Sequence, residues 1–120
     1  MMQRPTADAR GRRRGLHDRA AVFAALGDET RLALIGKLAA GAPHSISELA
    51  AGSALTRQAI TKHLRVLESA TIVRGARAGR EIRFALRPQP LHEAGAYLQR
   101  VSAQWDDALS RLKVHLEKRS

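Results

Sequence analysis

The stretch Thr56–Ser69 carries side chains whose types and spacing suit contacts with DNA. At 3.6 residues per turn, one face of it is polar and free of acids, and it holds Gln58, Thr61, Lys62 and Arg65. Glutamine can bond adenine, lysine or arginine can bond guanine, and threonine can contact a base edge or a phosphate. These residues predict a helix that enters the major groove, with a solvated surface helix as the simpler alternative.

The opposite face of this stretch is apolar and would hold the helix in place. Ile60, Leu64 and Leu67 fall within about 60° of one another on a helical projection and form one stripe. Thr56 is a favourable N-cap residue. Leu55 and Ile60 flank the first turn at the spacing of a hydrophobic staple. The stretch is therefore expected to be a helix with one buried and one exposed face.

Three shorter helices are predicted before it, at Leu16–Leu26, Asp28–Ala40 and Ser45–Ala51. Asp28 can cap the second. The third begins with Ser45 and Glu48 at the spacing of a capping box, with Ser47 as an alternative cap. A turn of four residues then leads into the polar-faced helix. Two short helices joined in this way, the second one basic, predict a helix-turn-helix over residues 45–69.

A β-hairpin is predicted next, over residues 71–87. Ile72 and Val73 begin a strand, and residues 81–86 alternate between apolar and polar. Gly75 and Gly79 permit the turn between the two strands. The tip and flank of the hairpin carry four arginines, Arg74, Arg77, Arg80 and Arg83. Such a hairpin predicts a wing along the DNA backbone or minor groove, the alternative being a solvated hairpin with incidental charge.

Residues 90–118 are expected to form one long helix. Leu91, Leu98, Trp105 and Leu112 recur every seven residues, and this period favours packing against another helix. We expect the partner to be the same helix of a second subunit, helped by the first helix, with Trp105 as the anchor. The alternative is a helix that folds back on its own domain. The predicted dimer interface comprises Leu16, Val22, Phe23, Leu91, Leu98, Val101, Trp105, Leu109 and Leu112.

Length and charge are consistent with one small DNA-binding domain. The chain has 120 residues and a net charge of +10. The excess is concentrated in residues 1–19, with six arginines against two acids, and in residues 56–87, with eight basic residues against two acids. A localised basic excess indicates a polyanionic partner, and nucleic acid fits it better than a membrane surface. Residues 1–15 are read as a disordered basic tail that either adds to DNA affinity or stays solvated, and residues 16–120 as the domain.

Several function classes find no support in the sequence. The chain has no cysteine, and therefore no disulfide, thiolate metal site or cysteine nucleophile. It also lacks a nucleophile elbow, a phosphate-binding glycine loop and a zinc-protease histidine pair, so we expect neither an enzyme nor a cofactor. No signal-peptide or membrane-spanning pattern is present, and the expected location is the cytoplasm, on the nucleoid when DNA is bound.

Four segments resemble the arsenical-resistance-repressor (ArsR/SmtB) family of winged-helix regulators. They are ALGDETRLALIGKL, ISELA, LTRQAITKHLRVLESATIV and GREIRFAL, within residues 18–118. The resemblance implies a mainly α fold with a small β-hairpin wing (winged helix-turn-helix, order α-α-α-α-β-β-α) and a long C-terminal dimerisation helix. It also implies a homodimeric regulator, usually a repressor, that binds an inverted repeat in double-stranded DNA.

The resemblance also carries site residues. The positions that match the family's recognition-helix contacts are Thr56, Arg57, Gln58, Thr61, Lys62 and His63, and those that match its wing are Arg77 and Arg80. His63 lies about 60° from Ile60 on the helix, so it suits packing and phosphate bonding equally.

Metal sensing in the family uses residues that this chain does not match. The cysteines are absent, and His92 and Glu93 are followed about ten residues on by Ala103 and Gln104. The chain therefore resembles the metal-independent branch. Two alternatives stay open: a sensor of a metal or small ligand at the dimer helices, and a protein-interaction module that does not read sequence. A zinc or nickel site across the dimer would draw on His17, His92, His115 or Asp106.

Overall fold

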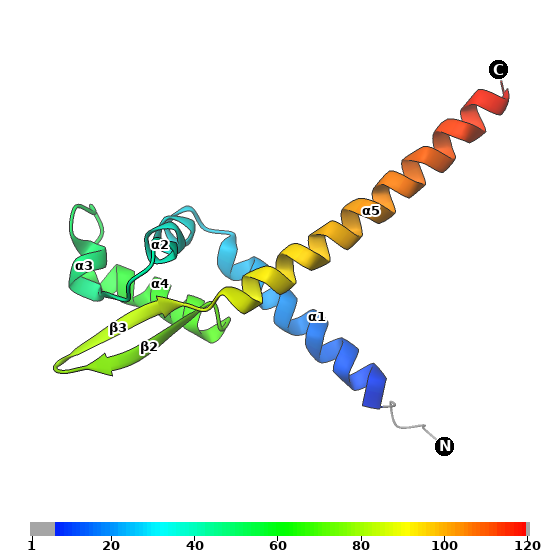
Figure 1. Cartoon of the computed structure of the whole chain (residues 1–120). Helices are drawn as coiled ribbons and strands as arrows, with labels where there is room; N and C mark the ends of the chain where they lie inside the picture. Colours follow the sequence, from blue (N-terminus) through cyan, green and yellow to red (C-terminus); the bar gives the residue numbers. More distant parts are fainter. Residues whose placement is uncertain (1–6, 120) are drawn as a thin grey trace.

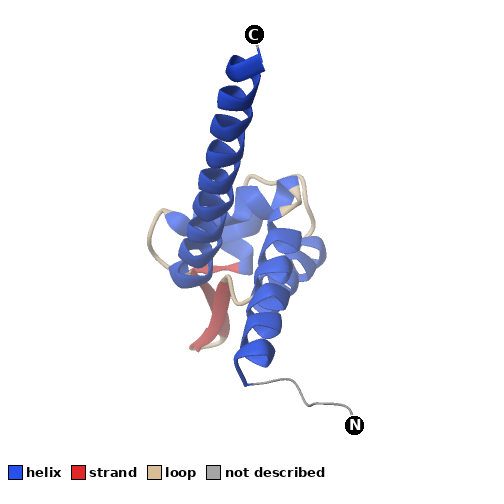
Figure 2. Ribbon diagram, turned by 90° about the vertical axis from the view of Figure 1, so that its right-hand side faces the viewer, coloured by secondary structure: helices blue, strands red, loops and turns tan. Residues whose placement is uncertain are grey.

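The computed structural model describes residues 7–119. Within that range the chain folds into five helices and a small sheet (Figures 1 and 2). The elements are α1 (Ala7–Leu26), α2 (Glu29–Ala39), β1 (His44–Ser45), α3 (Ile46–Ala50), α4 (Arg57–Ser69), β2 (Val73–Ala78), β3 (Glu81–Leu86) and α5 (Pro88–Arg119). Helices α3 and α4 form the predicted helix-turn-helix, and β2 and β3 form the wing. The fold is a winged helix-turn-helix with a long C-terminal helix.

Helix α1 starts nine residues earlier than the sequence analysis predicts. It begins at Ala7 rather than Leu16, so residues 7–15, which were predicted to belong to a disordered tail, are helical. Alanine and arginine, which dominate this segment, are among the best helix formers, and no proline interrupts the segment. The rest of the predicted tail, residues 1–6, lies outside the described range.

Side chains cap the first turns of α2, α3 and α4. The carboxylate of Asp28 and the hydroxyls of Ser45 and Thr56 each accept a hydrogen bond from the backbone N–H three residues further on, at 2.9, 3.1 and 3.1 Å. All three capping residues have extended backbone angles, as N-caps require. The predicted caps are confirmed, and they fix where α2, α3 and α4 begin.

The sheet is antiparallel with strand order β1-β3-β2. Strands β2 and β3 pair from Val73 with Leu86 to Ala78 with Glu81. Two residues of β1 add a third strand that was not predicted, because two residues are too short for a visible alternation. Gly79, at φ +65°, lies in the hairpin turn as expected. Gly75 does not; it lies inside β2, opposite Phe84.

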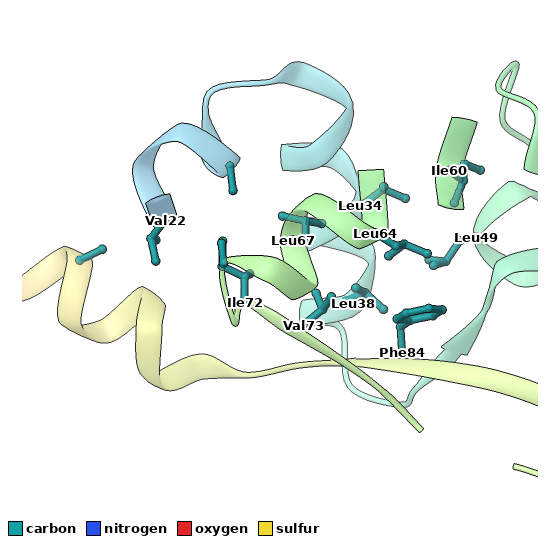
Figure 3. Close-up of a cluster of buried hydrophobic side chains, with 13 residues drawn as sticks. Val22, Leu34, Leu38, Leu49, Ile60, Leu64, Leu67, Ile72, Val73 and Phe84 are labelled. Atoms are coloured by element: carbon teal, nitrogen blue, oxygen red, sulfur yellow. The ribbon is translucent and has the colours of Figure 1, made fainter. Parts of the chain in front are cut away.

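The hydrophobic core forms around the inner face of α4 (Figure 3). Ile60, Leu64 and Leu67, the stripe predicted from the sequence, are fully buried. They pack with large apolar side chains from each neighbouring element of the domain: Val22, Leu34, Leu38, Leu49, Ile72, Val73 and Phe84. The same helix therefore holds the core together and carries the candidate reading face.

Helix α5 starts in the domain and then leaves it. Pro88 and Pro90 lie in its first turn, where a missing N–H breaks no intrahelical bond. Near its start α5 crosses α1, where the rings of Phe23 and Tyr97 lie 6.1 Å apart (Figures 1 and 2). From residue 102 to residue 119 every side chain is exposed. Over residues 7–119, no helix is both long enough and apolar enough to span a membrane.

Leu64→Ala should destabilise the domain by about 2–5 kcal/mol, because it removes a fully buried side chain and leaves a cavity. Leu32→Ala is the matched control, since Leu32 on α2 is 52% exposed, and it should cost less than about 1 kcal/mol. Urea unfolding at one protein concentration measures both losses. Equal losses would show that the inner face of α4 is not the core.

Asp28 should contribute to stability in a way that depends on pH. The backbone N–H of Arg31 that donates to its carboxylate, together with the charge of Arg31, lowers the pKa of Asp28 below its ordinary 3.8. Because the folded pKa is the lower one, this stabilisation is complete above the ordinary value and is lost as the pH falls through the folded value.

Asp28→Asn keeps an oxygen that can cap α2 but removes the titrating group. The stability advantage of the wild type over this variant should therefore shrink between about pH 6 and about pH 3. Urea midpoints across that range test the prediction. An advantage that stays constant would contradict it.

Candidate nucleic-acid interface

The residues predicted to read DNA lie together on the outer side of α4. Arg57, Gln58, Lys62 and Arg65 are exposed, and Thr61 is half-buried among them. The hydroxyl of Thr61 donates a hydrogen bond to the carbonyl of Arg57 at 2.8 Å. Its proton is therefore engaged, which leaves a methyl group and an acceptor oxygen for a base edge. No acid lies in the first turn of α4, so the end of the helix that favours phosphate keeps its positive character.

His63 lies on a different side of α4 from these residues. Its Nδ1 is 3.8 Å from a carboxylate oxygen of Asp28 and 3.4 Å from Nη1 of Arg31, and its side chain is only 23% exposed. Of the two arrangements that the sequence allowed, the structure has the packed one. His63 therefore joins α4 to the start of α2.

Arg31, which was not among the predicted site residues, links three helices at this corner. Its Nε donates to the carbonyl of Ala25 at 2.6 Å and its Nη2 to that of Ala24 at 3.4 Å, so the guanidinium satisfies carbonyls at the end of α1. Its backbone N–H bonds Asp28 at the start of α2, and its Nη1 reaches His63 on α4. Only the position of Arg31, three residues after a capping aspartate, could have pointed to such a role.

The wing arginines fall into two groups. Arg74, Arg77 and Arg80 are exposed, and Nε of Arg77 donates to the carbonyl of Gly79 in the turn at 3.4 Å. Arg83 is half-buried and faces the domain: its Nη2 lies 2.9 Å from Glu48 on α3 and 3.4 Å from Glu81, and its Nη1 donates to the carbonyl of Pro43. Arg83 fastens the wing to α3, and the other three extend along the hairpin.

The residues predicted for a dimer interface also divide into two groups. Val22 is buried in the chain's own core, Phe23 packs against Tyr97, and Leu91 packs against the core. Val22 is therefore engaged within the chain, because its position on α1 faces the domain. Val101 is half-buried. The remaining residues, Leu16, Leu98, Trp105, Leu109 and Leu112, are exposed on α1 and α5.

Among the side chains described by the structure, those of residues 15–119, no group of three His, Asp or Glu is placed to hold a metal ion. His17 lies on α1, whereas His92, Asp106 and His115 are spread along α5. One chain therefore does not bring these four residues together.

Comparison with known proteins gives the same architecture. Residues 19–76 match a family model described as a helix-turn-helix domain. The chain is 39% identical to an ArsR-like transcriptional regulator from Rhodococcus sp. RHA1, with a TM-score of 0.73 over 82% of this chain and 92% of that one. The crystal structure of an ArsR family transcriptional regulator is 30% identical, with a TM-score of 0.69 over 75% and 92% of the two chains.

A more distant structure shows the same fold. The homodimeric winged helix-turn-helix DNA-binding domain of a possible ArsR-family regulator from Mycobacterium bovis is 21% identical, with a TM-score of 0.63 over 87% of this chain and 92% of that one. No curated protein sequence matches the chain. The identity and coverage of the first two structures, joined to the helix-turn-helix and wing described above, establish that this chain belongs to the ArsR family of winged helix-turn-helix proteins, which are DNA-binding transcriptional regulators.

Proposed function

We propose that this chain is a sequence-specific repressor that binds an inverted-repeat operator as a homodimer. The observation that carries the proposal is the division of α4 into two faces. Its inner face is fully buried in the core, so the helix cannot rotate, and its outer face presents side chains that hydrogen-bond base edges. A rigid helix with such a face is suited to reading sequence.

Base reading and phosphate binding fall to different residues in this proposal. Gln58, Thr61 and Lys62 face base edges in the major groove. Thr56, Arg57 and Arg65 flank them and contact phosphates. The exposed wing arginines, Arg74, Arg77 and Arg80, follow the backbone or minor groove and supply affinity that depends on salt. His63 does not contact DNA in this proposal; it holds α4 against α2 through Asp28 and Arg31.

A second copy of the chain is the partner that fits α5. The radius of gyration is 20.2 Å, against about 14 Å for a compact chain of this length, because α5 extends beyond the domain (Figure 1). An apolar stripe runs along the exposed part, at Leu98, Trp105, Leu109, Leu112 and Leu116. An identical stripe repeating every seven residues can pack on it about a two-fold axis. The homodimeric state of the Mycobacterium bovis domain supports this arrangement.

Dimerisation sets the form of the operator. Two copies of α4 related by a two-fold axis would enter successive major grooves about 34 Å apart, so the operator should be an imperfect palindrome. Occupancy of such a site would block the polymerase. In this proposal the regulator works in the cytoplasm, has no catalytic activity, and answers to a signal other than a metal or to its own concentration.

Lys62→Ala should reduce discrimination between operator and random DNA by about 10-fold or more, because it removes a base contact. Arg80→Ala should instead weaken binding to both duplexes equally and flatten the salt dependence by about one unit of slope. Lys118→Ala, at the far end of α5, is the control that removes one positive charge away from α4 and the wing.

An operator for this test can be selected from random duplexes with the wild-type protein. Fluorescence anisotropy at several salt concentrations then gives both the specificity ratio and the slope. An unchanged ratio for Lys62→Ala would mean that the reading face is assigned wrongly.

Trp105 is the only tryptophan of the chain and is 64% exposed on α5, so its fluorescence reports on the proposed interface. At micromolar concentration its emission should be that of a buried indole, and dilution should shift it to the red. Leu112→Glu should weaken the dimer by about 10-fold or more, because it buries a charge in the apolar seam. Ser110→Glu, on the outward side of the same helix, should not. Analytical ultracentrifugation that finds a wild-type monomer at all concentrations would refute the dimer.

A further inference from the structure

Helix α4 carries one acid, Glu68, in its last turn. The surrounding segment from residue 56 to residue 87 has eight basic residues and only one other acid. A carboxylate close to a DNA-binding surface repels phosphate, so by charge alone Glu68 should weaken binding. A contact that offsets this repulsion would explain an acid at this position.

The carboxylate of Glu68 bonds the backbone of the wing. Its Oε2 accepts a hydrogen bond from the backbone N–H of Gly75 at 3.0 Å. Gly75 lies in β2, between Arg74 and the residues that lead to Arg77. The bond therefore joins the end of the recognition helix directly to the strand that carries two of the three exposed wing arginines.

Gly75 is suited to this contact because it has no side chain. A Cβ there would lie 2.9 Å from Cε1 of Phe84, 3.2 Å from the Glu68 carboxylate and 3.2 Å from Ile82. The first of these distances is too short for any side chain without movement of the buried ring. The missing Cβ thus lets the carboxylate and the strand approach each other, and this accounts for a glycine inside β2.

The chain between the two residues is also held in place. The backbone N–H groups of Thr71 and Ile72 donate to the carbonyls of Glu68 and Leu67, both at 2.9 Å, and the Ile72 side chain is fully buried. The turn after α4 is thereby fixed. Beyond Val73, β3 is held by its pairing with β1 and by the Arg83–Glu48 ion pair, and the Glu68–Gly75 bond holds β2.

We propose that Glu68 is a positioning residue that sets the angle between the wing and α4, so that wing arginines reach the DNA backbone while α4 occupies the major groove. This inference rests on the proposed function. Glu68 then has two effects of opposite sign on DNA binding: its charge weakens binding to any DNA, and its bond to Gly75 strengthens binding to the operator.

Three substitutions separate these effects. Glu68→Gln removes the charge and keeps an oxygen that can accept from Gly75. Glu68→Ala removes both the charge and the acceptor. Glu68→Asp keeps the charge but is one methylene shorter, so its oxygens fall short of Gly75. In anisotropy titrations with the selected operator, Glu68→Gln should bind as tightly as wild type or more tightly. Glu68→Ala and Glu68→Asp should bind about 10-fold more weakly.

The wing provides the control for a merely structural effect. In a background with Arg74, Arg77 and Arg80 all replaced by alanine, Glu68→Ala should cause no further loss of operator binding, because the residues it positions are gone. A loss of the same size in both backgrounds would overturn the proposal. So would equal tightening of operator binding by Glu68→Ala and Glu68→Gln, because that is the signature of charge repulsion alone.

The bond itself can be followed without DNA. Amide hydrogen exchange at Gly75 in the free protein should be about 10-fold faster in Glu68→Ala than in wild type and should change little in Glu68→Gln. Unchanged exchange in Glu68→Ala overturns the positioning role. A wild-type protein that binds operator and scrambled duplex equally overturns the proposed function instead, whatever the Gly75 amide does, so the two failures are distinguishable.

Discussion

Burial of the inner face of α4 is the constraint on which the rest of the structure depends. Ile60, Leu64 and Leu67 are fully enclosed by α2, α3 and the base of the wing, so the helix can neither slide nor rotate without exposing them. Its outer face is consequently fixed in direction, which a reading surface requires. The Thr56 cap sets where the helix begins and Asp28, Arg31 and His63 tie its middle to α2, so polar contacts refine what the apolar face has already fixed.

Local patterns were sufficient to predict most of this design. The apolar stripe of α4, the caps at Asp28, Ser45 and Thr56, the hairpin and the long last helix each follow from residue spacing. Features that depend on distant partners or on side-chain direction do not follow from local patterns. The pairing of β1 with β3, Gly75 inside a strand and Arg83 turned toward Glu48 are of this kind. The early start of α1 was missed because the prediction relied on large apolar side chains, which residues 7–15 lack, rather than on helix propensity.

Contacts within the domain also determine which wing arginines are exposed. Of the wing arginines, Arg83 is held against the domain, which leaves Arg74, Arg77 and Arg80 exposed. In our proposal these three arginines supply phosphate contacts, and Glu68 positions the strand that carries two of them. The exposed apolar stripe of α5 serves dimerisation in the same proposal. A single chain leaves Trp105 and its apolar neighbours in water, and a second copy would cover them. The dimer would then bind a palindromic site with two copies of α4, one from each subunit, related by the two-fold axis.

The central claim is that the outer face of α4 reads sequence rather than charge. Fluorescence anisotropy at physiological salt tests it most directly, by comparing duplex DNA from just upstream of the gene for this chain with a scrambled duplex of the same composition. An autoregulating repressor should prefer the upstream duplex by about 10³-fold or more. Equal and strongly salt-dependent binding to both duplexes, and to duplexes selected from a random pool, would contradict the claim, because it would mean that the basic surface binds DNA without reading it.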